Sequence, residues 1–127
     1  ELARGQRVVM VPHVTDREAL ADLLAALDCY VSAAPFETFG LAVCEALASG
    51  VPVVAVDHGA AAELVRASGA GVLAPYGDGP ALGEAILALL ARDREPLSAA
   101  ARAHVETHHR WDVALIQLVN VYRRLIA

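Results

Sequence analysis

The sequence predicts an α/β protein built on a parallel, doubly wound sheet with helices on both faces. Short apolar runs rich in Val and Ala alternate along the chain with segments of helical spacing, and glycines or prolines separate the two. The length of 127 residues suits one domain, so we expect residues 1–127 to form a single unit. In sheets of this kind, ligands bind at the carboxyl ends of the strands.

The expected strands are short apolar runs of the kind that pack between layers of helices. They lie at residues 8–11, 29–32, 53–56 and 71–74, and the last is the weakest. Pro52 opens the third run, at a position where its missing N–H removes no ladder hydrogen bond. We expect a parallel sheet that contains at least the first three runs.

Six segments have the spacing of helices. The first begins at Thr15, because its hydroxyl and Glu18 three residues later match a capping box. The second, at residues 40–49, ends at Gly50, a residue type that commonly follows the last helical turn. The others are expected at residues 60–67, 81–91, 95–107 and 111–126. The last of them carries an apolar stripe that begins at Trp111.

Composition and charge exclude several function classes. The net charge is −5 and no basic block stands out, so a nucleic-acid partner is not expected. No apolar run approaches the roughly 18 residues that would span a bilayer, and the first residues lack the layout of a signal peptide. We therefore expect a soluble, cytoplasmic protein. Cys29 and Cys44 are expected to be small buried hydrophobes, since their spacing supports neither a disulfide nor a metal site.

The most informative stretch runs from Glu37 to Val54. It places one carboxylate, Glu37, in a loop and a second, Glu45, on the helix that follows, with Gly40 between them. A carboxylate accepts hydrogen bonds from vicinal hydroxyls, and a helix N-terminus receives phosphate. The stretch therefore predicts a site for a molecule that has both groups, such as a nucleotide-sugar.

Other interpretations of the two acids stay open at this point. Both side chains could be solvated charges, although a Glu inside an apolar helix is rarely buried without a partner. Paired carboxylates are also typical of glycosidases. The loop-to-helix junction at residues 38–41 favours a phosphorylated donor instead. It is neither a Walker P-loop nor a G-x-G-x-x-G fingerprint.

Two histidines are possible members of the site. His13 follows the first expected strand, and His58 lies beside Gly59 in the loop after the third. The loops at residues 33–37 and 57–60 both leave strand carboxyl ends, so we expect them to share one crevice.

The remaining polar residues of note are expected at the surface. Glu63 is expected to be solvated, and Arg66 lies three positions further on, within pairing distance. His104, His108 and His109 fall among late helices. Their spacing does not match H-E-x-x-H, so we expect no metal.

The stretch from Glu37 to Val54 resembles the E-x7-E motif of the family 4 retaining glycosyltransferases. Members of that family consist of two Rossmann-like domains, an arrangement called the GT-B fold. The resemblance covers roughly residues 8 to 126, and the segment from Trp111 to Tyr122 is similar to the family's closing helix. It implies that the chain is a truncated C-terminal domain, the half that binds the nucleotide-sugar donor.

The resemblance also implies a role for each residue of the motif. Glu37 would accept hydrogen bonds from hydroxyls of the donor hexose and would be the catalytic residue, and Glu45 would accept from the ribose. Thr38 would belong to the donor site as well. The backbone amides of Phe39, Gly40 and Leu41 would contact the sugar and the diphosphate. No metal or other cofactor is implied, because a helix dipole and basic residues can offset diphosphate charge.

The chain departs from the family pattern in three respects. The earlier strands and the loop that supply an Arg and a Lys for the diphosphate are absent, and so is the N-terminal acceptor domain. The loop at residues 57–60 carries one glycine where the family often has two.

These features lead us to expect the donor-binding part of a retaining glycosyltransferase that uses a UDP- or GDP-sugar and a hydroxyl acceptor. The fragment alone is expected to be inactive. Two alternatives remain: a non-enzymatic α/β binding or partner domain, and part of a nucleotide-sugar epimerase. The sequence leaves the base, the sugar and the acceptor open.

Overall fold

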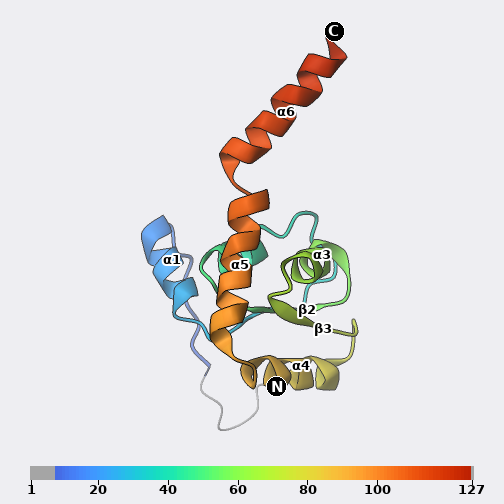
Figure 1. Cartoon of the computed structure of the whole chain (residues 1–127). Coiled ribbons are helices and arrows are strands. Elements are labelled where there is room, and N and C mark those ends of the chain that lie inside the picture. The colour runs from blue at the N-terminus through green and yellow to red at the C-terminus, as the bar shows by residue number, and fades with distance from the viewer. Residues whose placement is uncertain (1–7, 127) are drawn as a thin grey trace.

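A computed structural model of the chain describes residues 8–126 (Figure 1). Its elements are α1 (Arg17–Ala25), β1 (Tyr30–Ser32), α2 (Leu41–Ala48), β2 (Val53–Val56), α3 (Gly59–Ser68), β3 (Gly71–Ala74), α4 (Gly79–Leu90), α5 (Arg94–His108) and α6 (Trp111–Leu125). The three strands form one parallel sheet in the order β1-β2-β3. The expected α/β class is confirmed.

The sheet is packed between helices on both faces. Alternate residues of β2 point to opposite sides, and all four are buried. Val53 and Ala55 join a core cluster with Leu47 of α2 and with residues of α3 and α5, whereas Val54 packs with Leu89 of α4 on the other face (Figure 1). Each fully buried Val or Leu side chain stabilises the folded state by about 1.5–3 kcal/mol relative to an exposed one. These two layers fix the strand ends, where the loops of the site begin.

The helix boundaries lie close to the expected ones, with one correction at α1. Asp16, not Thr15, is the N-cap, and its carboxylate accepts from the Ala19 amide at 2.8 Å. Asp is as good a cap as Ser or Thr, so the neighbouring residue took the position. At the end of α2, Gly50 donates to the Leu47 carbonyl and Val51 donates to the Ala46 carbonyl, each at 2.9 Å. This pair of bonds is a Schellman motif, which stops the helix at the expected place.

The prediction of a strand at residues 8–11 is wrong. The segment is irregular and exposed, with Met10 86% accessible. A strand needs a neighbour for its backbone hydrogen bonds. In the common doubly wound order 3-2-1-4-5-6, the last three strands are neighbours in sequence order, and the strand before them lies at the far edge. The observed order β1-β2-β3 matches those last three strands, so the segment has no neighbour among the described strands.

Helix α6 projects away from the rest of the molecule (Figure 1). None of its residues is buried, and Trp111 at its start is 80% exposed. The apolar stripe predicted from its spacing is present, but within residues 8–126 it has no surface to cover. Among the described residues, no helix is both long and apolar enough to cross a membrane.

Candidate functional site

The loops that follow the strands meet at the carboxyl edge of the sheet. The Ala60 amide, at the start of α3, donates to the Glu37 carbonyl at 3.3 Å, which joins the loops after β1 and β2. Gly59 has φ 72°, and a Cβ there would lie 2.5 Å from the Pro35 carbonyl oxygen. The single glycine of this loop therefore stands where the two backbones touch. The two loops are therefore adjacent, as expected, and the ligand crevice between them stays a prediction.

The N-terminus of α2 is formed by Gly40. Its φ of 83° is left-handed, and a Cβ there would lie 2.7 Å from Cδ1 of Leu64 on α3. No side chain caps this helix end. The first-turn amides of a helix have no partner inside the helix, and the macrodipole places about half a positive charge there. This junction is therefore suited to receive an anionic group.

Glu37 lies in the loop before α2 and Glu45 lies on α2 itself, so the two acids flank Gly40 along the chain. Burial raises the pKa values of the Tyr30 hydroxyl and the Cys44 thiol, and the negative charges of Glu37 and Glu45 raise both further. Glu37 is half-buried, while Glu45 is exposed on the solvent side of α2. Because Glu45 is exposed, it does not need the buried partner that its apolar sequence context suggested.

Glu45 opens onto a groove of about 530 Å³ between α2, α5 and the start of α6. Its walls include Phe39, Leu41, Cys44, Ala48, His108, His109 and Trp111. A neighbouring hollow of about 460 Å³ is lined by Thr38, Phe39, Glu63 and the same two histidines, together with His104. Phe39, His108 and His109 line both hollows, so the two lie next to each other.

A second polar group lies after β2 and β3. One oxygen of the Asp57 carboxylate contacts Nδ1 of His58 at 2.9 Å and accepts from the Tyr76 amide at 3.1 Å. The bond to His58, followed by the bond to Tyr76, holds the pKa of Asp57 below its usual range. The Tyr76 ring lies 5.6 Å from the His58 ring and 6.5 Å from the Phe36 ring. His58 thus lies at the crevice edge within an aromatic group.

Sequence reasoning overlooked Tyr76 and Phe36. Phe36 directly precedes Glu37 and is 90% exposed, and Tyr76 follows β3 by two positions. The rule that placed the other loops at the carboxyl edge applies equally to the loop after β3, and would have found Tyr76.

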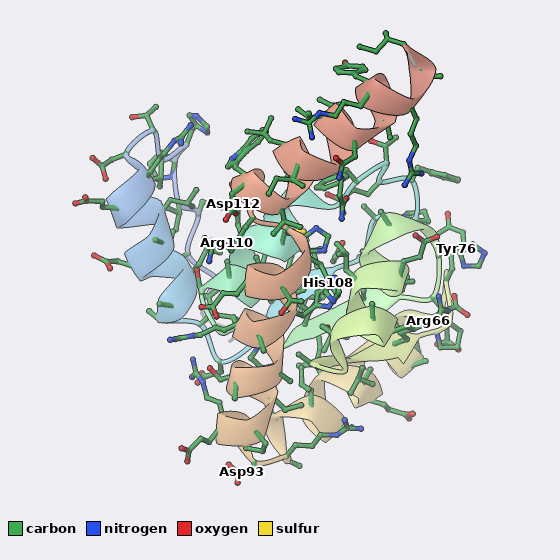
Figure 2. All side chains as sticks on the ribbon, turned by 45° about the horizontal axis from the view of Figure 1, so that its top comes forward. Arg66, Tyr76, Asp93, His108, Arg110 and Asp112 are labelled. Atoms are coloured by element: carbon green, nitrogen blue, oxygen red, sulfur yellow. The ribbon has the colours of Figure 1, made fainter. Side chains whose placement is uncertain are left out.

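Three further polar residues named in the sequence analysis lie away from the two carboxylates or make contacts that were not expected. His13 is exposed in the irregular segment before α1 and lines neither of the two hollows. Arg66, labelled in Figure 2, donates to the Asp57 carbonyl at 3.4 Å, an interaction that sequence reasoning did not anticipate. Glu63 is exposed, as expected.

Of the three late histidines, His108 alone is exposed as expected. His104 and His109 are half-buried, and their rings lie 5.2 Å apart, with His108 5.0 Å from His104. His109 also contacts the Phe39 ring edge-on at 6.1 Å. Burial, followed by the charges of His109 and His108, lowers the pKa of His104. Within residues 8–126, no set of three or more potential ligands is arranged around a metal position.

Comparison with known proteins assigns the chain to a described protein family. The sequence profile of the family described as glycosyl transferases group 1 matches residues 1–92. The phosphatidyl-myo-inositol mannosyltransferase of Mycobacterium leprae is 41% identical over 88 residues, which are 68% of this chain and 23% of that protein. The GDP-mannose-dependent alpha-mannosyltransferase of Mycobacterium tuberculosis is 35% identical over 103 residues, or 81% of this chain and 27% of that protein.

The same relationship is seen in three dimensions. The solved structure of sucrose-phosphate synthase from Thermosynechococcus elongatus matches 96% of this chain with a TM-score of 0.84 and 34% identity, and the match covers 31% of that chain. The present chain thus spans about a quarter of the length of the curated relatives it matches.

Proposed function

The chain belongs to the glycosyl transferases group 1 family, and from this premise we propose that it is the donor-binding part of a retaining family 4 glycosyltransferase. The parent would move a hexose from a nucleoside diphosphate sugar to a hydroxyl acceptor and keep the anomeric configuration. One observation carries the proposal: Glu37 and Glu45 flank the uncapped N-terminus of α2 at the carboxyl edge of the sheet.

The diphosphate is assigned to the junction before α2. Amides of Phe39, Gly40 and Leu41 donate to its oxygens, and Thr38 belongs to the same turn. Hydrogen bonds to a charged group are each worth about 1.5–3 kcal/mol. Together with the helix dipole, these bonds offset charge that a metal ion would otherwise neutralise. We therefore propose transfer without a metal or other cofactor.

The two acids are assigned to opposite ends of the donor. From Gly40 to Glu45 the helix rises about 7–8 Å, at about 1.5 Å per residue. That separation suits a carboxylate at the hexose, from Glu37, and one at the ribose, from Glu45. Glu37 is also the proposed catalytic residue, since its negative charge stabilises the positive charge that develops at the anomeric carbon.

The loop after β2 is the proposed second wall of the sugar site. Gly59 lets this loop approach Pro35 and Glu37, and His58 is fixed beside it by the Asp57 carboxylate. His13 remains a candidate from the sequence alone.

The relatives suggest which nucleotide to test first, and the exposed helix α6 supports a partner domain. One relative is described as GDP-mannose-dependent, so GDP is the first nucleotide to test and UDP the second. The exposed apolar stripe of α6 and the greater length of the relatives support an N-terminal acceptor domain that covers this helix. Residues 1–127 would then be one nucleotide-sugar-binding unit of a two-domain enzyme. This unit alone would be inactive.

We also place the parent in the cytoplasm. Cys29 and Cys44 are free thiols, as is usual in a reducing compartment. Imaging of a tagged parent tests this assignment.

Calorimetry with GDP, UDP and inorganic phosphate tests the proposal. We expect a nucleotide to bind more tightly than phosphate, and Glu45→Gln to weaken that binding about tenfold or more through lost charge-assisted bonds. Glu84→Gln, which removes an exposed carboxylate of α4 on the far side of the sheet, is the matched control. Equal binding of phosphate and nucleotide would favour a non-enzymatic module. Product analysis of the parent separates transfer from epimerisation.

A further inference from the structure

Three rings gather beside the proposed donor site, each from a different loop at the carboxyl edge of the sheet. Phe36 lies in the loop after β1, His58 in the loop after β2 and Tyr76 in the loop after β3. The Phe36 and Tyr76 rings meet edge to face, with centroids 6.5 Å apart, and the Tyr76 and His58 rings are tilted by 53°. Phe36 is 90% exposed and Tyr76 52% exposed. These three residues, here called the aromatic cluster, therefore leave ring faces open to a ligand.

Polar contacts fix the orientation of the cluster. One carboxylate oxygen of Asp57 lies 2.9 Å from Nδ1 of His58 and accepts from the Tyr76 amide at 3.1 Å. An ionised carboxylate can only accept hydrogen bonds, so in the neutral His58 ring the proton lies on Nδ1 and Nε2 is an acceptor. The Asp57 carbonyl in turn accepts from Arg66 of α3 at 3.4 Å. The cluster thus combines apolar ring faces with a hydrogen-bond acceptor of fixed tautomer.

This combination suits the ring of a sugar or of another cyclic polyol. The C–H bonds on one face of such a ring carry weak positive charge and pack against the negative face of an aromatic side chain. The hydroxyl groups around the same ring can donate to a nitrogen such as Nε2 of His58. Small-molecule sites commonly pair apolar walls with a few placed polar groups in this way.

The strand order indicates which sugar ring would lie here. The proposed donor site is formed by the loop after β1 and the start of α2, and the hexose at Glu37 is the last group of the donor. The sheet continues from β1 to β2 and β3. Neighbouring strands are about 4.7–4.9 Å apart, so Tyr76 follows a strand roughly 9–10 Å from β1. The cluster therefore lies beyond the hexose, on the side away from the nucleotide, where the group that receives the hexose must enter.

We propose that the aromatic cluster is a subsite for the acceptor, and that the acceptor carries a sugar or cyclitol ring. This proposal rests on the proposed function, because the assigned donor site sets the direction from donor to acceptor. Phe36 and Tyr76 pack against the apolar face of the acceptor ring, and Nε2 of His58 accepts from one of its hydroxyls. The ring then lies between this cluster and the N-terminal domain proposed above.

Ligand-observed NMR on the 127-residue chain tests the proposal, with methyl α-D-mannopyranoside and myo-inositol as probes. We expect weak, saturable binding of at least one probe, both without GDP and with saturating GDP, because the nucleotide lies elsewhere. Phe36→Ala and Tyr76→Ala should each weaken this binding by about twofold to tenfold, the range that corresponds to one aromatic contact. Their affinity for GDP should match that of the wild-type chain, which shows that both variants are folded. Leu87→Ala is the matched control, because it removes an exposed apolar side chain of α4.

The same titrations distinguish failure of this proposal from failure of the proposed function. If neither GDP nor UDP binds, the donor assignment is wrong and the acceptor subsite is overturned with it. If GDP binds but neither probe binds saturably, or if Phe36→Ala binds the probes as Leu87→Ala does, the acceptor subsite alone is overturned. Displacement of a probe by GDP-mannose but not by GDP would show that the cluster holds the donor hexose, which also contradicts the proposal.

Discussion

The sheet with its packed helices and the projecting helix α6 both carry apolar side chains, but those of the sheet are buried and those of α6 are exposed. In β2, all four residues are buried between two layers of helices. In α6, Trp111 and the apolar residues that follow it on the stripe are exposed. A stripe of that kind is stable in water only when another surface covers it. We therefore assign the proposed donor site to the packed body, and we propose that α6 packs against a surface outside residues 8–126.

The largest effect expected from this difference concerns activity. We expect the isolated chain to transfer no sugar, because no second domain holds the acceptor against the anomeric carbon. Positioning of this kind accounts for roughly 7–11 kcal/mol of a barrier. Incubation with a labelled GDP-sugar and acceptor, followed by chromatography, measures the outcome. Slow hydrolysis of the donor is compatible with the account, but a transfer product from this chain alone would contradict it.

The next effect compares how much a truncated side chain lowers the free energy of unfolding in the packed body and in α6. Leu47→Ala removes a fully buried side chain of α2 and should lower the free energy of unfolding by about 2–5 kcal/mol. Leu118→Ala removes an exposed side chain of α6 and should change it by less than about 0.5 kcal/mol. Urea unfolding followed by circular dichroism gives both values. Similar costs at the two positions would show that α6 is packed in solution.

A smaller effect tests how closely the crevice loops approach each other. Gly59→Ala should cost about 1–3 kcal/mol, because φ is positive and the new Cβ meets the Pro35 carbonyl. Gly77→Ala is the matched control: its φ is 81°, but no atom lies within 4 Å of the added Cβ. Thermal unfolding of both variants isolates the contact from the backbone strain. Nucleotide affinity should fall only in Gly59→Ala, and equal behaviour of the two would contradict the shared crevice.

The smallest expected effect is a pH dependence at Asp57. Its pKa is lowered in the folded chain, so its contribution to stability is present above the unfolded pKa of about 3.9 and is lost as pH falls through the folded pKa. Asp57→Asn should therefore flatten the decline of the urea midpoint below about pH 4. Glu84→Gln serves as the control. The direction alone is predicted, because the carboxylate is exposed to solvent.

Patterns in the local sequence predicted most of the packed body. They failed where the structure of a segment depends on residues distant in the sequence. β1, β2 and β3, the helix end at Gly50 and the meeting of the two crevice loops followed from apolar runs, glycines and the strand-end rule. Residues 8–11 have the same apolar pattern, but a pattern cannot supply a neighbouring strand. The contact between His104 and His109 depends on the turn at the end of α5. The sequence shows how far apart these residues lie along the chain, but not that the His109 ring folds back to contact His104.

Glu37 and Glu45 are proposed to bind opposite ends of the donor, and calorimetry on the full-length parent can separate their two roles. Glu37→Ala and Glu45→Ala would each be titrated with the bare nucleoside diphosphate and with the intact donor. We predict that Glu37→Ala leaves binding of the bare diphosphate nearly unchanged while impairing transfer strongly, and that Glu45→Ala weakens both ligands alike. If Glu37→Ala weakens the bare diphosphate as much as Glu45→Ala does, the two acids form one nucleotide-binding cluster and the division is wrong.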